Sequence, residues 1–266
     1  MPFYKYQNYD LHFQNNGSGE IALLFVHGLG GDGGSWKFQV EYFKDRFRVI
    51  TVDLFGHGRS SKEIDPVEAP RLDAEALVAL MLNEIKQPYI VIGHSFASAI
   101  LPEMIKLGDS FMKGVVFADC VYQGFEIVIG QRMSFASSML AFSDEQLPEE
   151  TRKWYLNLLA ADANPDELEL ILSSLKNCDY RWLFQSVAGT REYNEKYPPG
   201  ETPMRDNVQI FIMEADQGVG NDFKKSWVNH FKNARYYLFE NSWHFFFITK
   251  HSKFNSLIDD FIEECL

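Results

Sequence analysis

Short runs of apolar and β-branched residues alternate with segments of helical periodicity along the first 120 residues of the chain. These runs lie at residues 21–26, 47–52, 89–92 and 114–118. Nearly continuous apolar strands of this kind are typical of a parallel sheet that is covered on both faces. Between them, residues 36–43 and 72–81 carry apolar side chains at helical spacing. The order of strand, helix and strand therefore predicts βαβ units and an α/β fold.

The pattern changes after residue 120. Up to about residue 200 the apolar residues show helical spacing only, as in 149–161 and 165–176. Strands return at 208–213 and 235–239, and a last helix is expected near 252–264. We therefore expect one α/β core, formed by residues 1–121 and 203–266, with a helical insertion at 122–202.

The composition argues against several classes of protein. A net charge of −12 is too acidic for a protein that binds nucleic acid by neutralising phosphates. Three widely spaced cysteines fit neither a disulfide framework nor a zinc site. No apolar run approaches the roughly 20 residues that span a bilayer, and the first residues lack the pattern of a secretory signal. We expect a cytoplasmic protein without a metal or a cofactor.

The most specific local pattern is Gly93-His94-Ser95-Phe96-Ala97, which lies between an expected strand and an expected helix. At a tight turn of this kind a serine hydroxyl projects from the end of the sheet, and small flanking residues let the backbone pass its neighbours. The alternative is a buried serine that caps a helix. The pattern predicts that Ser95 is a nucleophile.

A serine nucleophile needs a general base and an acid that orients it. His244 is the best placed histidine, because it follows the strand at 235–239, at the sheet edge where such folds hold their functional groups. Asp216 follows the strand at 208–213 and is the expected acid, because the chain order of serine, acid and histidine is then the usual one. Asp119, which ends the strand at 114–118, is the rival.

Two glycine-rich turns follow strands. In His27-Gly28-Leu29-Gly30-Gly31 the glycines allow backbone amides to point into a cavity. The N–H groups of Leu29 and Phe96 would then form an oxyanion hole. A phosphate-binding turn is the alternative, but neither of the nucleotide-binding glycine motifs is present. The turn at residues 53–60 is interpreted as structural.

Four motifs together resemble the α/β-hydrolase superfamily: H-G-L-G-G at 27–31, D-x-x-G-H-G-x-S at 53–60, G-H-S-x-A at 93–97 and S-W-H at 242–244. The resemblance implies a mostly parallel sheet of eight strands and a helical cap over about residues 122–202. It also implies a triad of Ser95, His244 and Asp216, with Leu29 and Phe96 as oxyanion donors. Two departures from the family pattern are Ala97, in place of a second glycine, and the absence of a glycine shortly before Asp216.

Within that superfamily, a serine nucleophile indicates acyl transfer. The insertion is rich in apolar and aromatic residues, most of which are expected to pack the cap on the core. If some of them line the cleft, they favour a small and largely apolar substrate. We expect a hydrolase, monomeric or homodimeric, that cleaves a carboxylic ester through an acyl-enzyme on Ser95. The alternatives are a carbon–carbon bond hydrolase or a thioesterase with the same triad, or a receptor of the same fold that binds a small molecule without turnover.

Overall fold

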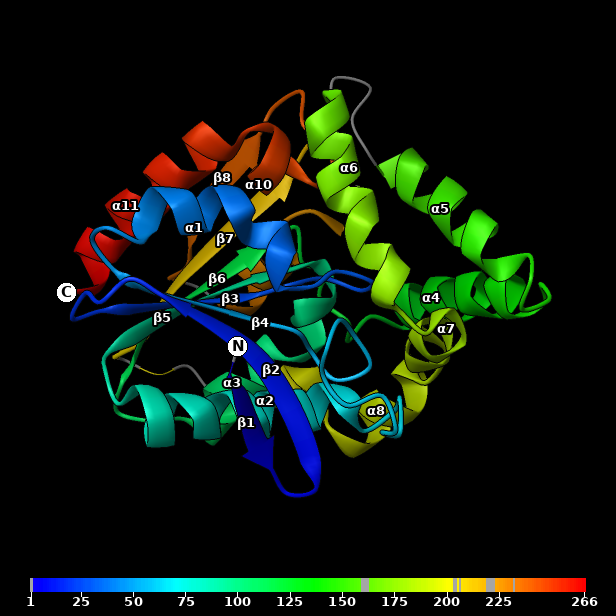
Figure 1. Cartoon of the computed structure of the whole chain (residues 1–266), viewed down its shortest axis with the longest axis horizontal. Coiled ribbons are helices and arrows are strands. Elements are labelled where there is room, and N and C mark those ends of the chain that lie inside the picture. Colours follow the sequence, from blue (N-terminus) through cyan, green and yellow to red (C-terminus); the bar gives the residue numbers. More distant parts are fainter. Residues whose placement is uncertain (1, 159–162, 203–204, 206, 219–222, 232) are drawn as a thin grey trace.

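The computed structural model describes residues 2–158, 163–202, 205, 207–218, 223–231 and 233–266. At its centre lies an eight-stranded sheet with the order β1-β2-β4-β3-β5-β6-β7-β8 (Figure 1). The six expected strands are present as β3 (Ala22–Val26), β4 (Arg48–Val52), β5 (Tyr89–His94), β6 (Met112–Ala118), β7 (Gln209–Ala215) and β8 (Arg235–Phe239). These six strands pair in parallel, which confirms the predicted α/β fold.

The two remaining strands form an antiparallel hairpin at one edge of the sheet, β1 (Phe3–Tyr6) and β2 (Tyr9–Asn16). Strand β2 also pairs antiparallel with β4. The residue pattern did not indicate these strands, although the family resemblance implied eight. Both are partly exposed and carry polar residues, so they lack the continuous apolar runs that mark the central strands.

Alternate residues of the central strands pack on opposite faces of the sheet. Leu24, Val26 and Val91 belong to one hydrophobic cluster, with residues of α2 (Ala69–Leu80) and α3 (Leu101–Leu107). Leu23 and Phe25 belong to a second cluster, with residues of α1 (Lys37–Phe43) and α11 (His251–Cys265). Helices therefore cover both faces, as Figure 1 shows, and the carboxyl ends of the strands are left to carry functional loops.

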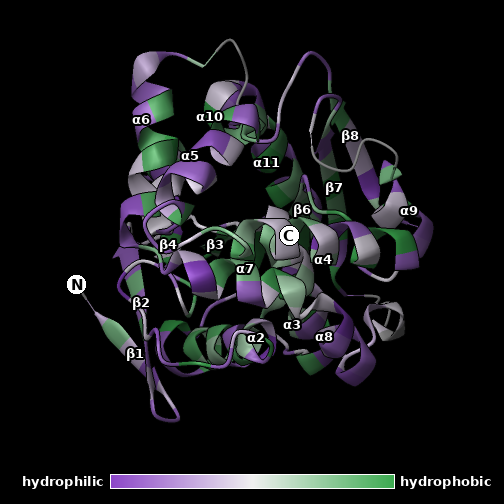
Figure 2. Cartoon of the chain, turned by 90° about the vertical axis from the view of Figure 1, so that its right-hand side faces the viewer, coloured by the Kyte–Doolittle hydropathy of each residue, from purple (hydrophilic) through white to green (hydrophobic). Residues whose placement is uncertain are grey.

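A group of helices lies between β6 and β7 in the chain and on one side of the molecule, which faces the viewer in Figure 2. The group consists of α4 (Glu126–Leu140), α5 (Leu147–Leu158), α6 (Pro165–Ser173), α7 (Tyr180–Ala188) and α8 (Thr190–Lys196). Helix α4 contacts α5, α7 and α8, and a small apolar cluster of its own includes Met139 and Phe184.

Shorter helical segments complete the fold. They are η1 (Gly33–Trp36), η2 (Met81–Ile85), η3 (Ser95–Ala99), η4 (Ser174–Asn177), η5 (Pro199–Glu201), α9 (Ser226–His230) and α10 (Phe246–Thr249). Of the helix expected at 149–161, residues 159–161 lie outside the described part of the chain, as do residues 203 and 204 at the expected end of the insertion. In the described ranges, no helix is both long and apolar enough to cross a membrane.

Candidate active site

Ser95 lies at the turn between β5 and η3, in the left-handed region of backbone space with φ of 53°. Such a conformation is strained for a residue with a side chain and is found at functional turns. A Cβ atom on Gly93 would lie 2.7 Å from the Cβ of Ala97 and 2.9 Å from a methyl group of Leu101. The sharp turn therefore requires glycine at 93 and a small residue at 97.

His244 reaches Ser95 from the loop after β8. Its Nε2 atom lies 2.9 Å from the Ser95 Oγ, a hydrogen-bonding distance, although the two residues are 149 positions apart in the chain. The imidazole is buried. The structure thus brings together the serine and the histidine that the sequence singled out.

The carboxylate beside this histidine belongs to Asp119. The Nδ1 atom of His244 lies 2.6 Å from Oδ2 of Asp119, and both side chains are buried. The expectation that Asp216 would take this position is wrong, and the rival considered from the sequence is in place instead. Ser95, His244 and Asp119 form a continuous hydrogen-bonded line.

Asp119 is held by the end of the neighbouring strand β7. Its backbone N–H donates to the carbonyl of Met213 at 2.8 Å, and its Oδ1 accepts from the N–H of Ala215 at 3.1 Å. The Lys224 ammonium lies 3.8 Å from the same oxygen. The residue has a φ of 46°, so here too the backbone takes a left-handed conformation. These contacts fix the carboxylate in the orientation that meets the imidazole.

Asp216 faces the backbone of the loop that carries His244. Its two carboxylate oxygens accept hydrogen bonds from the N–H groups of Asn241 at 2.8 Å and Ser242 at 2.9 Å. Burial opposes ionisation, but the N–H groups of Ser242 and Asn241 outweigh it and lower the pKa of Asp216. Asp216 therefore organises the loop two residues before His244 and does not touch the imidazole.

The position of the acid could not be decided from chain order. Strands β6 and β7 are neighbours in the sheet, so Asp119 and Asp216 both emerge at the same edge. What separates them is the direction of each carboxylate after the strand, which depends on backbone contacts between loops. No residue pattern in the sequence reports that direction.

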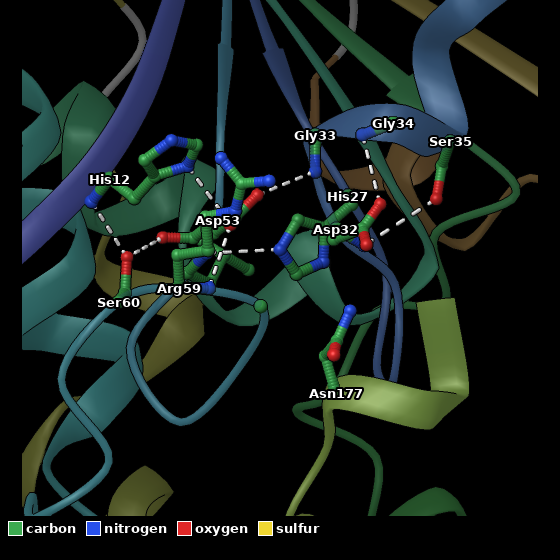
Figure 3. A network of polar contacts seen from close by, with 12 residues as sticks. His12, His27, Asp32, Gly33, Gly34, Ser35, Asp53, Arg59, Ser60 and Asn177 are labelled. Atoms are coloured by element: carbon green, nitrogen blue, oxygen red, sulfur yellow. Dashed lines mark hydrogen bonds and ion pairs between the residues drawn. The ribbon is translucent and has the colours of Figure 1, made fainter. Parts of the chain in front are cut away.

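A dense polar network supports the glycine-rich loop after β3 (Figure 3). Asp53 accepts from the N–H groups of Gly33 and Arg59, both at 2.8 Å, and from Nδ1 of His12 at 3.0 Å. The N–H of Leu54 donates to Nε2 of His27 at 2.9 Å. These hydrogen bonds connect the turn at residues 53–60 to the segment that begins at His27. They agree with the interpretation of this turn as structural.

His27 holds the loop from within. Its Nδ1–H donates to the Gly28 carbonyl at 2.7 Å, and burial lowers the pKa of the imidazole. A Cβ on Gly28 would lie 3.0 Å from the Cβ of Ser95, so this loop runs directly beside the serine. Phe96 stands at the start of η3, where backbone N–H groups have no acceptor within the helix. Leu29 and Phe96 remain the predicted oxyanion donors.

Ser95 and His244 line a cavity of about 210 Å³ between the sheet edge and the helices that follow β6. Helices α4 and α5 contribute Phe135, Trp154 and Tyr155 to its wall. Further residues of the wall are Phe96, Val121, Val128, Leu158, Ile171, Val187, Phe223, Phe245, Phe247 and Ile248. The space in front of the serine is therefore enclosed mainly by apolar side chains.

Residues 23–256 match the model of the alpha/beta hydrolase family. The chain belongs to this family. Lipase LipV of Mycobacterium tuberculosis is 31% identical to this α/β hydrolase over 182 residues, which are 65% of the chain and 66% of the lipase. The chain thus spans just under two thirds of that relative's length.

Solved structures of α/β hydrolases superpose on nearly the whole chain. A thermophilic esterase from Thermogutta terrifontis has a TM-score of 0.79 at 16% identity and covers 97% of this chain and 94% of its own. The enol-lactonase from Burkholderia xenovorans LB400 has a TM-score of 0.78 at 16% identity and covers 98% of this chain and 100% of its own. Structural similarity at such low sequence identity shows that the fold is shared. The reaction has to be inferred from the residues of the site.

His94 also belongs to this hydrolase site, although the sequence pattern predicts no functional role for it. Its Nε2–H donates to the backbone carbonyl of His244 at 3.0 Å, and the two rings lie 4.4 Å apart between centroids. Burial and the neighbouring His244 hold the pKa of His94 well below its ordinary value, so the ring is neutral. The one indication of its role in the sequence is that it directly precedes Ser95.

No cluster of three or more histidine, cysteine or acidic side chains that could hold a metal ion occurs among the described residues of the hydrolase. Cys120, Cys178 and Cys265 carry free thiols. Among the groups at the cavity are the Ser95 hydroxyl, the His244 imidazole paired with a carboxylate, and the backbone of the loop that contains Gly28 and Leu29. Such a set can perform nucleophilic acyl transfer.

Proposed function

We propose that this α/β hydrolase cleaves a small, largely apolar carboxylic ester through an acyl-enzyme on Ser95. The observation that carries the proposal is the hydrogen-bonded line of Ser95, His244 and Asp119, which opens into the apolar cavity. A buried carboxylate on Nδ1 keeps the other ring nitrogen free to accept the serine proton. The name of the relative LipV, a lipase, agrees with this reaction class.

In the first half of the reaction, the Ser95 Oγ attacks the carbonyl carbon of the ester and its proton passes to Nε2 of His244. The negative charge that develops on the carbonyl oxygen is stabilised by the N–H groups of Leu29 and Phe96. Asp119 stabilises the imidazolium that has formed. The tetrahedral intermediate then expels the alcohol, which takes the proton from Nε2 and leaves the acyl group on Ser95.

In the second half, a water molecule attacks the acyl carbonyl and gives its proton to Nε2 of His244. Collapse of the second intermediate returns that proton to the Ser95 Oγ and releases the carboxylic acid. Ser95, His244 and the oxyanion donors act in both halves of the reaction, so they need not change their positions between the two. The cavity of about 210 Å³ is smaller than the roughly 300 Å³ at which drug-sized ligand sites begin, which favours a small substrate.

We further propose that residues 122–202 act as a cap. Helices α4 and α5 supply Phe135, Trp154 and Tyr155 to the cavity, and the Tyr155 hydroxyl donates to the Leu29 carbonyl in the predicted oxyanion loop. The insertion and the core thus both supply apolar side chains to the wall of the cavity, whereas the reacting groups come from the core.

The proposal is tested by treating the protein with a fluorophosphonate and locating the label by mass spectrometry, together with a panel of ethyl and p-nitrophenyl esters of increasing acyl length. We expect a label on Ser95 and steady hydrolysis that falls by about 10⁵-fold in Ser95→Ala. Ser138→Ala, which changes an exposed serine on α4, serves as the matched control. A ligand-induced rise in Tm without turnover, or a label elsewhere, would contradict the proposal.

A further inference from the structure

Among the described residues, Arg132 is the one arginine or lysine that lines this largely apolar cavity. It lies on α4, one turn from Val128 and from Phe135, which line the same space. Residues three and four apart share one face of a helix, so this face of α4 is turned toward the cavity. Arg132 on α4 therefore lines the same cavity as Ser95 and His244 of the core.

Among the described residues that line the cavity, none is an aspartate or a glutamate that could balance this charge. The chain as a whole carries a net charge of −12. No ion pair of Arg132 occurs in the part of the chain that the structure describes. Burial lowers the pKa of the guanidinium to about 10, so the group still carries its charge at neutral pH.

One contact sets the orientation of the guanidinium. The Arg132 Nε–H donates to Oγ1 of Thr190 at 3.3 Å, and the Thr190 hydroxyl donates to the Val187 carbonyl at 2.7 Å. Within the described ranges, the two terminal nitrogens of Arg132 make no hydrogen bond. They are also not fully shielded from solvent. These donors therefore remain accessible beside the cavity.

A partly buried cation that has no charged partner among the described residues is stabilised when a ligand of opposite charge completes the site. The planar fork of a guanidinium matches a carboxylate in geometry and can bind both of its oxygens. We propose that Arg132 binds a free carboxylate of the substrate, so that this hydrolase acts on esters that carry an acid group at the far end of an apolar chain. The inference rests on the proposed function and names the substrate class of the same site.

The test compares esters that differ only in this charge. Monoethyl adipate carries a carboxylate on the acyl side, and 5-acetoxypentanoate carries one on the alcohol side. Each is assayed by acid release in a pH-stat beside the neutral analogue in which an isopropyl group replaces the carboxylate. We expect the wild-type protein to have a higher kcat/KM for at least one of the two acids than for its neutral analogue.

Arg132→Met keeps an apolar stem and removes the charge. We expect kcat/KM for the preferred acid to fall by about 30- to 100-fold, mainly through a higher KM, while the neutral analogue changes by less than about threefold. Arg132→Lys should restore part of the preference. Lys153→Met, which removes one positive charge from an exposed position on α5, should leave the preference unchanged.

Binding of adipate, measured by calorimetry with the wild type and Arg132→Met, separates this inference from the proposed reaction. If esters are hydrolysed through Ser95 but Arg132→Met affects acid and neutral esters equally, the inference is wrong and the proposed function stands. If Arg132-dependent adipate binding is found without hydrolysis at Ser95, the proposed function fails and the anion site remains. A wild-type preference for both neutral analogues, with no adipate binding, would overturn the inference.

Discussion

The loops that follow β6 and β7 begin at the same edge of the sheet, and each begins with or near an aspartate. In the first loop, Asp119 turns its carboxylate to the imidazole of His244 at 2.6 Å. In the second, Asp216 turns its carboxylate to the backbone N–H groups of Asn241 and Ser242. One carboxylate can therefore take part in proton transfer, and the other holds the loop that presents the histidine. Equivalent positions at a sheet edge do not imply equivalent roles.

The largest effect is expected where the first loop meets the histidine. His244→Ala should lower kcat for ester hydrolysis by about 10⁵-fold, because the proton of Ser95 then has no acceptor. If Asp119 acts only through this imidazole, Asp119→Asn should cause almost no further loss in the His244→Ala background. Steady-state kinetics of the single and double variants measure this coupling. A further loss of more than tenfold would show that Asp119 acts on the substrate by another route.

Gly218 in the second loop gives a sharper test of the position of Asp119. A Cβ at residue 218 would lie 2.2 Å from Oδ2 of Asp119, so Gly218→Ala must displace the carboxylate from His244. A misplacement of about 1 Å can cost about 10²-fold in rate, and we expect a loss of that order in kcat. Gly130→Ala is the control, since a Cβ there meets nothing within 4 Å. Full activity of Gly218→Ala would contradict the pairing of Asp119 with His244.

Asp216→Ala removes two acceptors from the loop that carries His244. We expect the free energy of unfolding to fall by about 1 kcal/mol, because the hydrogen bonds are partly exposed, and kcat to fall by less than about tenfold. Thermal melts and ester kinetics on the same preparations measure the two effects. A severe loss of activity with unchanged stability would mean that Asp216 acts on the imidazole after all.

His94, which binds the carbonyl of His244, links the site to the pH dependence of stability. The imidazole is neutral in the folded chain because burial lowers its pKa, whereas in the unfolded chain it gains a proton below about pH 6.5. Unfolding therefore takes up a proton in this range, and His94 makes the fold less stable as the pH falls. Relative to His94→Gln, the wild type should lose about 1.4 kcal/mol more per pH unit below pH 6.5. The free energy of unfolding of both proteins is measured by denaturant titration at pH 7 and pH 5.5. If it falls by the same amount in the wild type and in His94→Gln, this prediction is wrong.

The sequence predicted those parts of the fold and site that depend on local pattern. Continuous apolar runs identified the six parallel strands, and the small residues around Ser95 identified the tight turn that the structure shows. His244 could be selected because its place after the last strand already limits it to the correct sheet edge. Each of these features is determined by residues that are close together in the chain, so it can be recognised from the sequence.

Features that arise between distant segments could not be predicted in this way. The edge hairpin of β1 and β2 alternates polar and apolar residues too weakly to be distinguished from a loop. The direction of the Asp119 carboxylate depends on the Met213 carbonyl and the Ala215 N–H, nearly one hundred residues away. The place of Arg132 in the cavity wall becomes visible only when the cavity lining is known.

The pair of isosteric variants Asp119→Asn and Asp216→Asn, assayed for kcat with one ester under identical conditions, tests most directly which carboxylate serves the histidine. Asparagine keeps the shape of each side chain and removes the charge that fixes the imidazole tautomer. We expect a loss of about 10⁴-fold for Asp119→Asn and of less than about tenfold for Asp216→Asn. A large loss for Asp216→Asn together with a mild effect of Asp119→Asn would contradict the account.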